Sequence, residues 1–215
     1  NTAVGSFSLE DNTANYNTGI GYRALLENTT GANNTAVGRD TLKSNTTGAS
    51  NVAIGMNALD ANTTASNNVA IGQDALGANT TGANSVALGH NALAAHTANN
   101  DNVAVGYFSM RYNTTGYQNT AVGKGSLQAN TTGALNTAIG DQALEANTTA
   151  DNNTGVGHKS LNQNTTGTQN TAVGNYAGYS ITTGNNLTAV GYNAAYTNTG
   201  GENTAIGAEA LELNT

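Results

Sequence analysis

Residues 28–38 read NTTGANNTAVG, and residues 130–140 read NTTGALNTAIG. Near-copies of this segment fill the chain of 215 residues. The glycine that ends each N-T/V-A-V/I-G recurs every 17 residues, except in the first and last intervals, which are one residue shorter. A fixed short period is typical of a solenoid, in which each repeat stacks on the next. We therefore predict a single repeat domain over residues 1–215. The repeated glycines are Gly5, Gly21, Gly38, Gly55, Gly72, Gly89, Gly106, Gly123, Gly140, Gly157, Gly174, Gly191 and Gly207.

The residues before each glycine have the pattern of a β-strand. The residue directly before it is Val, Ile or Leu, the next is Ala or Gly, and the third is Thr or Val. A position that accepts Thr or Val is typical of a strand. Strand alternation places the Thr/Val and Val/Ile positions on one face and the Asn and Ala positions on the other. We expect a neighbouring chain to approach closely at the small Ala position.

The rest of the unit predicts how each coil closes. Leu stands four residues after the glycine in most units, Thr stands eight after it, and Gly, Asn and Thr interrupt every possible helix. We predict an all-β, parallel β-solenoid of about thirteen 17-residue coils, each with two strands of about five residues and two tight turns. The apolar core is narrow, so backbone ladders, side-chain ladders and a buried subunit interface must add stability. The predicted ladder residues are Asn28, Asn45, Asn62, Asn79, Thr29, Thr46, Thr63 and Thr80.

Composition excludes several classes of function. Charged residues make up 9% of the chain, the net charge is −7, and six scattered Lys and Arg form no basic patch, which argues against nucleic-acid binding. There is no cysteine for a disulfide or a thiolate metal site. No apolar run reaches the length of a membrane span. The chain begins with Asn1 inside the repeated phrase, so we interpret it as a mature or excised piece of a longer protein.

The pentapeptide carries a resemblance to a known family. N-T-A-V-G, with its variants N-V-A-I-G (51–55 and 68–72) and S-V-A-L-G (85–89), resembles the head repeat of the trimeric autotransporter adhesins, the YadA-like family. The resemblance implies a left-handed parallel β-roll, three chains packed side by side, and exposure on a bacterial surface for adhesion. The family's unit is a few residues shorter and lacks the N-T-T-G segment. Arrays of this kind are also similar to those of phage tail fibres.

We find no constellation that indicates catalysis. The element at residues 54–58 resembles the hexapeptide repeat of acyltransferases, but that fold needs three such elements per coil and an excursion carrying a His. His90, His96 and His158 lie in different repeats without ligand partners at a suitable spacing. The acidic residues are too irregular for repeated calcium sites. We therefore expect no enzyme activity, no metal and no cofactor. N-T-T occurs eight times as a formal glycosylation sequon, which we interpret as a turn motif.

Candidate binding residues gather near the end of the chain. Tyr176, Tyr179, Tyr192 and Tyr196 cluster where the Leu position lapses to Gly178 and Ala195. An aromatic patch here could bind glycan or protein by stacking, or the tyrosines could replace the missing Leu in the core. We expect a non-enzymatic, extracellular and homotrimeric structural segment of a surface adhesin or tail fibre, a rigid spacer whose variable turn residues contact a host protein or glycan. The alternative is a monomeric solenoid that binds glycan, or that binds ice through a regular Thr column.

Overall fold

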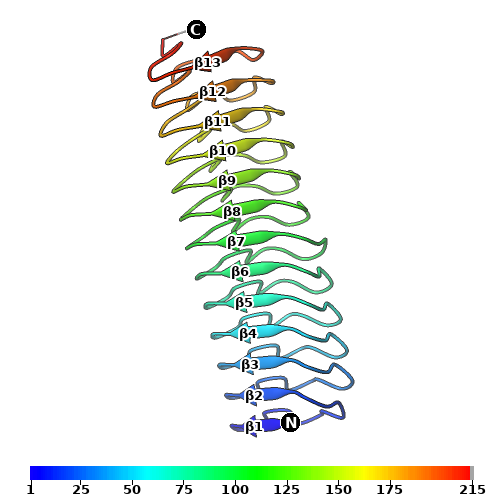
Figure 1. The fold of residues 1–215 in the computed structure, drawn as a ribbon. Helices are drawn as coiled ribbons and strands as arrows, with labels where there is room; N and C mark the ends of the chain where they lie inside the picture. The colour runs from blue at the N-terminus through cyan, green and yellow to red at the C-terminus, as the bar shows by residue number, and fades with distance from the viewer. Residues whose placement is uncertain (214–215) are drawn as a thin grey trace. The chain divides into compact units, whose positions relative to one another are not determined.

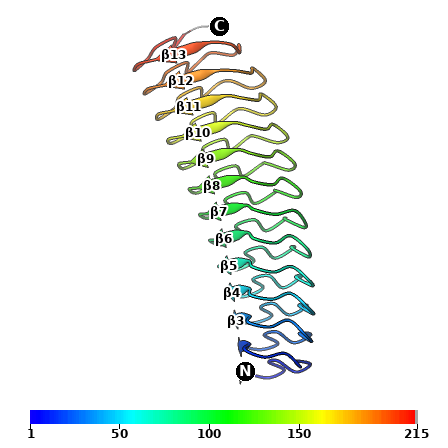
Figure 2. The same cartoon turned by 45° about the vertical axis from the view of Figure 1, so that its right-hand side comes forward.

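The computed structural model describes residues 1–213, and all thirteen strands within that range are parallel and three residues long. The chain divides into two compact units, Asn1–Tyr107 and Phe108–Thr215. In each unit the chain makes one coil between successive strands (Figures 1 and 2), so the predicted all-β solenoid is confirmed. The first unit contains β1 (Thr2–Val4), β2 (Thr18–Ile20), β3 (Thr35–Val37), β4 (Val52–Ile54), β5 (Val69–Ile71), β6 (Val86–Leu88) and β7 (Val103–Val105). The second contains β8 (Thr120–Val122), β9 (Thr137–Ile139), β10 (Thr154–Val156), β11 (Thr171–Val173), β12 (Thr188–Val190) and β13 (Thr204–Ile206).

Strand register follows the repeat. In the first unit Thr18 pairs with Thr35 across one full repeat, whereas β1 and β2 pair Thr2 with Thr18 across the shortened first repeat. The second unit has the same full-repeat register from β8 to β12 and a shortened step from Thr188 to Thr204. Each residue therefore stacks on its own equivalent in the next coil, so side chains of one kind form continuous columns.

The prediction of two five-residue strands per coil was wrong. The segment after each glycine keeps its backbone ladder without extended strand geometry: the Leu25 amide donates to the Thr41 carbonyl at 3.0 Å, and the Asp40 amide donates to the Tyr22 carbonyl at 2.9 Å. The residues two and four after the glycine have left-handed φ, as at Asp40 (56°) and Leu42 (48°). These alternating left-handed residues bend the chain into turns while its amides still reach the neighbouring coil.

The glycine that ends each strand is required by both conformation and space. Gly72 has a φ of 132°, which side-chain-bearing residues rarely adopt. A Cβ at Gly72 would lie 2.5 Å from the carbonyl oxygen of Gly89 in the next coil. The same approach recurs at most of the repeated glycines, which explains why the period of the sequence appears most clearly in this residue.

The core lies inside each coil, between the strand and the opposite turn. The Ala at the centre of each strand is fully buried from β3 to β12, apart from Gly155 in β10, and the Leu four after the glycine is fully buried in most coils. The predicted alternation is thereby confirmed, because Ala points inward and its two strand neighbours point outward. The expectation that a neighbouring chain approaches at Ala was wrong, because the Ala side chain points into its own coil and Ala53 has 0% exposure.

Candidate functional site

The asparagines of N-T-T form a buried ladder in each unit, which we call the asparagine ladder. In the first unit Asn45 Nδ2 donates to Asn28 Oδ1 at 2.6 Å, and Asn62 Nδ2 donates to Asn45 Oδ1 at 2.7 Å. Asn79 continues the series at 3.3 Å. Each amide also donates to the carbonyl three residues ahead, as Asn45 does to Gly48 at 2.9 Å, and thereby closes its own turn. The ladder residues of the second unit are Asn113, Asn130, Asn147 and Asn164.

Burial of these asparagines bears on the glycosylation sequons. The side chains of Asn28, Asn45 and Asn130 have 0% exposure, and their amide nitrogens donate to neighbouring oxygens. A glycan would have to replace a hydrogen of such an amide and project from the middle of the core. The folded coil therefore uses N-T-T as a turn-closing element.

A second buried asparagine column precedes the strands, at the Asn position that was predicted to share a face with Ala but not to form a ladder. Asn34 Oδ1 accepts the backbone amide of Asn51 at 2.9 Å, and Asn51 Oδ1 accepts that of Asn68 at 3.0 Å. Asn51 Nδ2 donates to the carbonyl of Ala65 at 2.9 Å, so each side chain links two coils. The signal was present in the sequence, since Asn stands four residues before the glycine in most repeats.

The threonine column eight residues after the glycine lies at the edge of the coil. Thr29 Oγ1 donates to the Thr46 carbonyl at 2.9 Å, Thr46 to the Thr63 carbonyl at 3.0 Å, and Thr80 to the Thr97 carbonyl at 3.0 Å. Thr63 makes the same bond to Thr80 at 3.2 Å. These side chains are partly exposed. Because each hydroxyl donates a hydrogen bond to a carbonyl of the next coil, this column connects the coils.

Three of the four candidate tyrosines make contact, and we call Tyr176, Tyr179 and Tyr196 the tyrosine cluster. The rings of Tyr179 and Tyr196 are stacked, with centroids 5.1 Å apart and an interplanar angle of 7°. Tyr176 meets both rings edge-on at 5.5 and 5.9 Å. Tyr192 is 51% exposed, and no ring contact joins it to the cluster in the described part of the chain.

The structure adds two residues that the sequence did not associate with the tyrosines. The His158 ring meets Tyr176 edge-on with centroids 5.2 Å apart, and Lys159 Nζ lies 5.8 Å from the Tyr176 ring centroid. They come from the preceding repeat, one and two residues after its glycine. Only stacking of the coils brings them to this surface.

The tyrosines do not fill the core where Leu is missing. A Cβ on Gly178 would lie 2.9 Å from Leu161 Cδ2 and 3.0 Å from Leu187 Cδ2, so these leucines occupy the vacant space. Ile181 and Leu187 replace the Asn of the two asparagine columns in this coil, and both are buried. The interpretation that Tyr substitutes for Leu is therefore wrong, because apolar residues from the Asn positions take its place. The tyrosine cluster remains half-exposed, outside the core.

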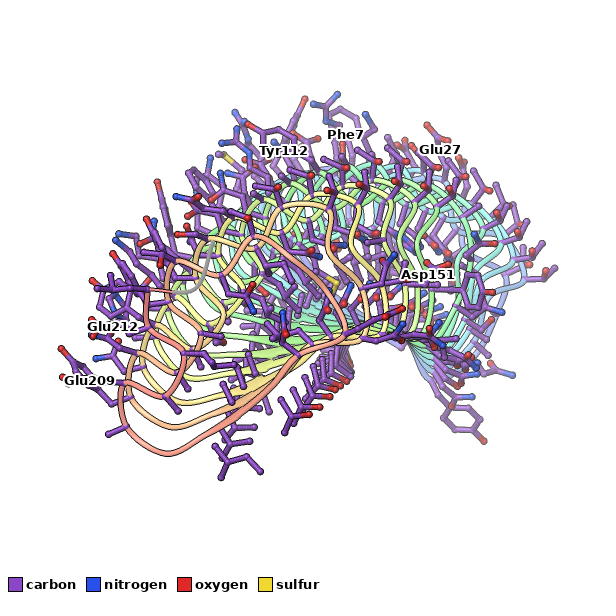
Figure 3. All side chains as sticks on the ribbon, turned by 90° about the horizontal axis from the view of Figure 1, so that it is seen from above. Phe7, Glu27, Tyr112, Asp151, Glu209 and Glu212 are labelled. Atoms are coloured by element: carbon purple, nitrogen blue, oxygen red, sulfur yellow. The ribbon has the colours of Figure 1, made fainter. Side chains whose placement is uncertain are left out.

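The outward side chains of the strands form an uncharged surface, which we call the strand face. It comprises the first and third residue of every strand, all of them Thr, Val, Ile or Leu. Ile54 is 39% and Ile71 is 37% exposed, while Val52 and Val69 are half-buried. In each unit the strands form the flat side of the coil and the turns form the curved side (Figure 3). Phe7 and Glu27 in the first unit project from that curved side.

The titratable side chains of the described residues are scattered over the coils, and burial shifts the pKa of two of them. Within residues 1–213, no three His, Asp or Glu side chains are placed to hold a metal ion. His96 occupies an asparagine-ladder position with 0% exposure, and burial lowers the pKa of its imidazole, while the 3.1 Å contact with the Asn99 carbonyl acts in the opposite direction. Burial raises the pKa of the Asp60 carboxyl, against the attraction of Lys43.

One polar hollow lies in the second unit, lined by Gly184, Asn185, Asn186, Gly201 and Glu202. It occurs where the last repeat shortens and the Glu202 amide donates to the Asn185 carbonyl at 2.7 Å. Its lining thus comprises two glycines, two asparagines and one glutamate. Among the described residues no helix is long and apolar enough to cross a membrane.

Comparison of the chain with protein-family models, with curated proteins and with solved structures finds no match.

Proposed function

We propose that this chain is a non-enzymatic structural and adhesive segment of an extracellular surface adhesin or tail fibre, a left-handed β-roll that packs as a homotrimer through its strand face. The observation that carries the proposal is the strand face itself. It is free of charge, rich in β-branched side chains, and half-buried to exposed in the isolated chain. Contiguous exposed apolar surface of this kind marks protein interaction sites.

The distribution of charge supports the same proposal. Lys, Arg, Asp and Glu are confined to the turns, as at Arg39, Asp40, Lys43 and Glu27, and none lies in a strand. A surface that only had to remain soluble would carry charges on its exposed strand positions. The resemblance of N-T-A-V-G to the YadA-like head repeat, which implies side-by-side trimers, agrees with an interface on the strand face.

Sedimentation equilibrium of the purified chain tests the assembly. We expect a species of three times the 21.6 kDa chain mass. Ile71→Lys should yield folded monomer, because the interface would bury an unpaired ammonium group. Gln73→Lys is the matched control: Gln73 is exposed in the turn of the same coil, and this change should leave the trimer intact. A wild-type chain that sediments as a monomer at micromolar concentration would refute the proposal.

The attachment surface of this segment is proposed to be the tyrosine cluster together with the variable turn residues. Half-exposed rings beside His158 and Lys159 offer stacking surface and hydrogen-bonding groups for a host glycan or protein. Binding to immobilised glycans and host-cell surfaces should fall with Tyr176→Ala and Tyr196→Ala. Tyr117→Ala removes a 46% exposed tyrosine from another coil of the second unit, outside the tyrosine cluster, and should reduce binding less than either cluster variant. Equal binding by all three variants would exclude the cluster.

A second candidate function, ice binding, is favoured by one feature of the strand face. From β8 to β13 its first column is Thr without exception, beside a Val or Ile column, at the regular spacing of parallel strands. Such an array could order water on a monomer. Inhibition of ice recrystallisation by monomeric chain at micromolar concentration would support this candidate, and growth of ice at the rate seen in buffer would exclude it.

A further inference from the structure

The strand face of the first unit is not uniform along its length. The first residue of the strand is Thr in β1, β2 and β3 and Val in β4, β5, β6 and β7. The neighbouring outward column is apolar throughout these four strands: Ile54, Ile71, Leu88 and Val105. We call Val52, Val69, Val86 and Val103 the valine block. In the second unit every strand begins with Thr.

The change from Thr to Val has no explanation inside the coil. Thr35 and Val52 are register partners in adjacent strands, both half-buried and both facing outward, and the buried Ala beside each is the same. Val and Thr have nearly the same shape and both favour strands, so either residue satisfies the fold. They differ in that Val has a methyl group where Thr has a hydroxyl. That difference matters where water is removed, because a hydroxyl buried without a partner is costly.

We infer that the valine block is a dry contact patch that fixes the axial register between copies of this chain. The inference rests on the proposed packing of copies through the strand face, and the occupant is a second copy. In the aligned parallel arrangement all four block strands of one copy meet block strands of the next. A displacement by one coil removes one Val–Val layer and places a Thr hydroxyl of β3 against Val of β4.

Regular repeats make this device necessary. A coil-to-coil displacement changes little on a face whose columns repeat from one coil to the next, so identical repeats specify register weakly. A block of four apolar strands next to three Thr strands breaks the translational symmetry of the first unit. It favours a single alignment without adding a charge or an insertion.

Disulfide trapping tests the inference, since the chain has no native cysteine. Val37→Cys and Ile71→Cys lie on the outward column of β3 and β5, two coils or about 10 Å apart along the stack. That distance exceeds the reach of a disulfide, about 7 Å between Cα atoms. The two variants are mixed after unfolding, refolded together, oxidised, digested and analysed by mass spectrometry.

The wild-type background should give 37–37 and 71–71 cross-links and almost no 37–71 cross-link. Converting the valine block to Thr (V52T, V69T, V86T and V103T) should raise the 37–71 fraction and raise the dissociation constant of the assembly at least about tenfold. Each change introduces the residue that the same column already holds, so the coil should fold, as circular dichroism would verify. The matched control replaces Thr120, Thr137, Thr154 and Thr171 by Ser, which keeps the hydroxyls and should preserve the cross-link pattern.

The outcomes separate this inference from the proposal beneath it. If the variant with Thr in place of the four valines remains assembled and gives only 37–37 and 71–71 cross-links, the valine block does not set the register. The proposed strand-face interface would still stand. If the wild-type mixture already gives 37–71 cross-links as often as 37–37, the copies have no fixed parallel register and the inference is overturned. A wild-type chain that is monomeric by sedimentation refutes both.

Discussion

Removing one amide from the asparagine ladder should destabilise the fold far more than removing an equally polar side chain from the same turn. The perturbation is Asn45→Ala. Asn45 is fully buried and takes part in three side-chain hydrogen bonds: its Nδ2 donates to Asn28 Oδ1 and to the Gly48 carbonyl, and its Oδ1 accepts from Asn62 Nδ2.

The magnitude follows from which partners lose their only bond. The Gly48 carbonyl still accepts from Asn34 Nδ2 at 2.8 Å, and Asn62 Nδ2 still donates to Ala65 at 3.1 Å. Asn28 Oδ1 and one N–H of Asn62 are left without their partner in the core. An unsatisfied buried polar group costs about 1–3 kcal/mol, so the two together cost about 2–6 kcal/mol. For a chain of this size, a loss of about 3 kcal/mol lowers Tm by about 6–12 °C.

The chain itself contains the same defect once. Ile181 occupies an asparagine-ladder position, and Asn164 Oδ1 and Asn198 Nδ2 on either side of it are buried without hydrogen-bond partners. By their place in the repeat they are equivalent to Asn28 Oδ1 and Asn62 Nδ2, the groups that lose a partner in Asn45→Ala. At Ile181 the buried apolar side chain offsets the loss, whereas Ala supplies only a methyl group.

Thermal unfolding followed by circular dichroism at fixed protein concentration measures the effect, since assembly would make Tm depend on concentration. Thr47→Ala is the matched control, because Thr47 is two residues away and exposed, and it should change stability by less than about 0.5 kcal/mol. Hydrogen exchange should localise the loss to the coils around Asn45. A Tm for Asn45→Ala equal to that of Thr47→Ala would refute the stabilising role of the ladder.

Three further predictions concern single residues. Stability should fall as pH is lowered through about 6.5, because burial lowers the pKa of His96 and the unfolded chain therefore binds a proton more tightly than the folded chain. His96→Asn should remove this component from a plot of Tm against pH. Gly72→Ala should prevent folding of its coil or lower the free energy of unfolding in urea by at least about 3 kcal/mol, because the new Cβ would lie 2.5 Å from the Gly89 carbonyl oxygen. The control is Gly77→Ala, where the nearest atom to the new Cβ is 3.4 Å away, and this change should be neutral or stabilising. Leu76→Ala should lower the free energy of unfolding by about 2–5 kcal/mol, since this side chain is fully buried, and a loss below about 1 kcal/mol would show that the core does not depend on the Leu column.

The candidate site was predictable in part. The sequence marked the N-T-T asparagines because they recur in most repeats. It marked the late tyrosines because they occur where the repeated Leu is missing. It missed the contribution of His158 and Lys159, which reach Tyr176 from the preceding coil. It also misjudged the residues around Gly178, because Leu187 lies nine positions later in sequence yet fills the space beside that glycine across the coil.

The sequence by itself determined the period, the position of the strand before each repeated glycine, the parallel register and the division of that strand's residues between two faces. These follow from local rules: one repeat is one coil, and successive strand side chains alternate. Which face is the interior was decided only by the tertiary structure. Alternation is equally satisfied with Ala inside or outside, and the choice depends on the direction in which the turn closes. Left-handed residues such as Leu42 bring the Leu and Asn columns over the Ala side, so the Thr, Val and Ile side chains are left facing outward.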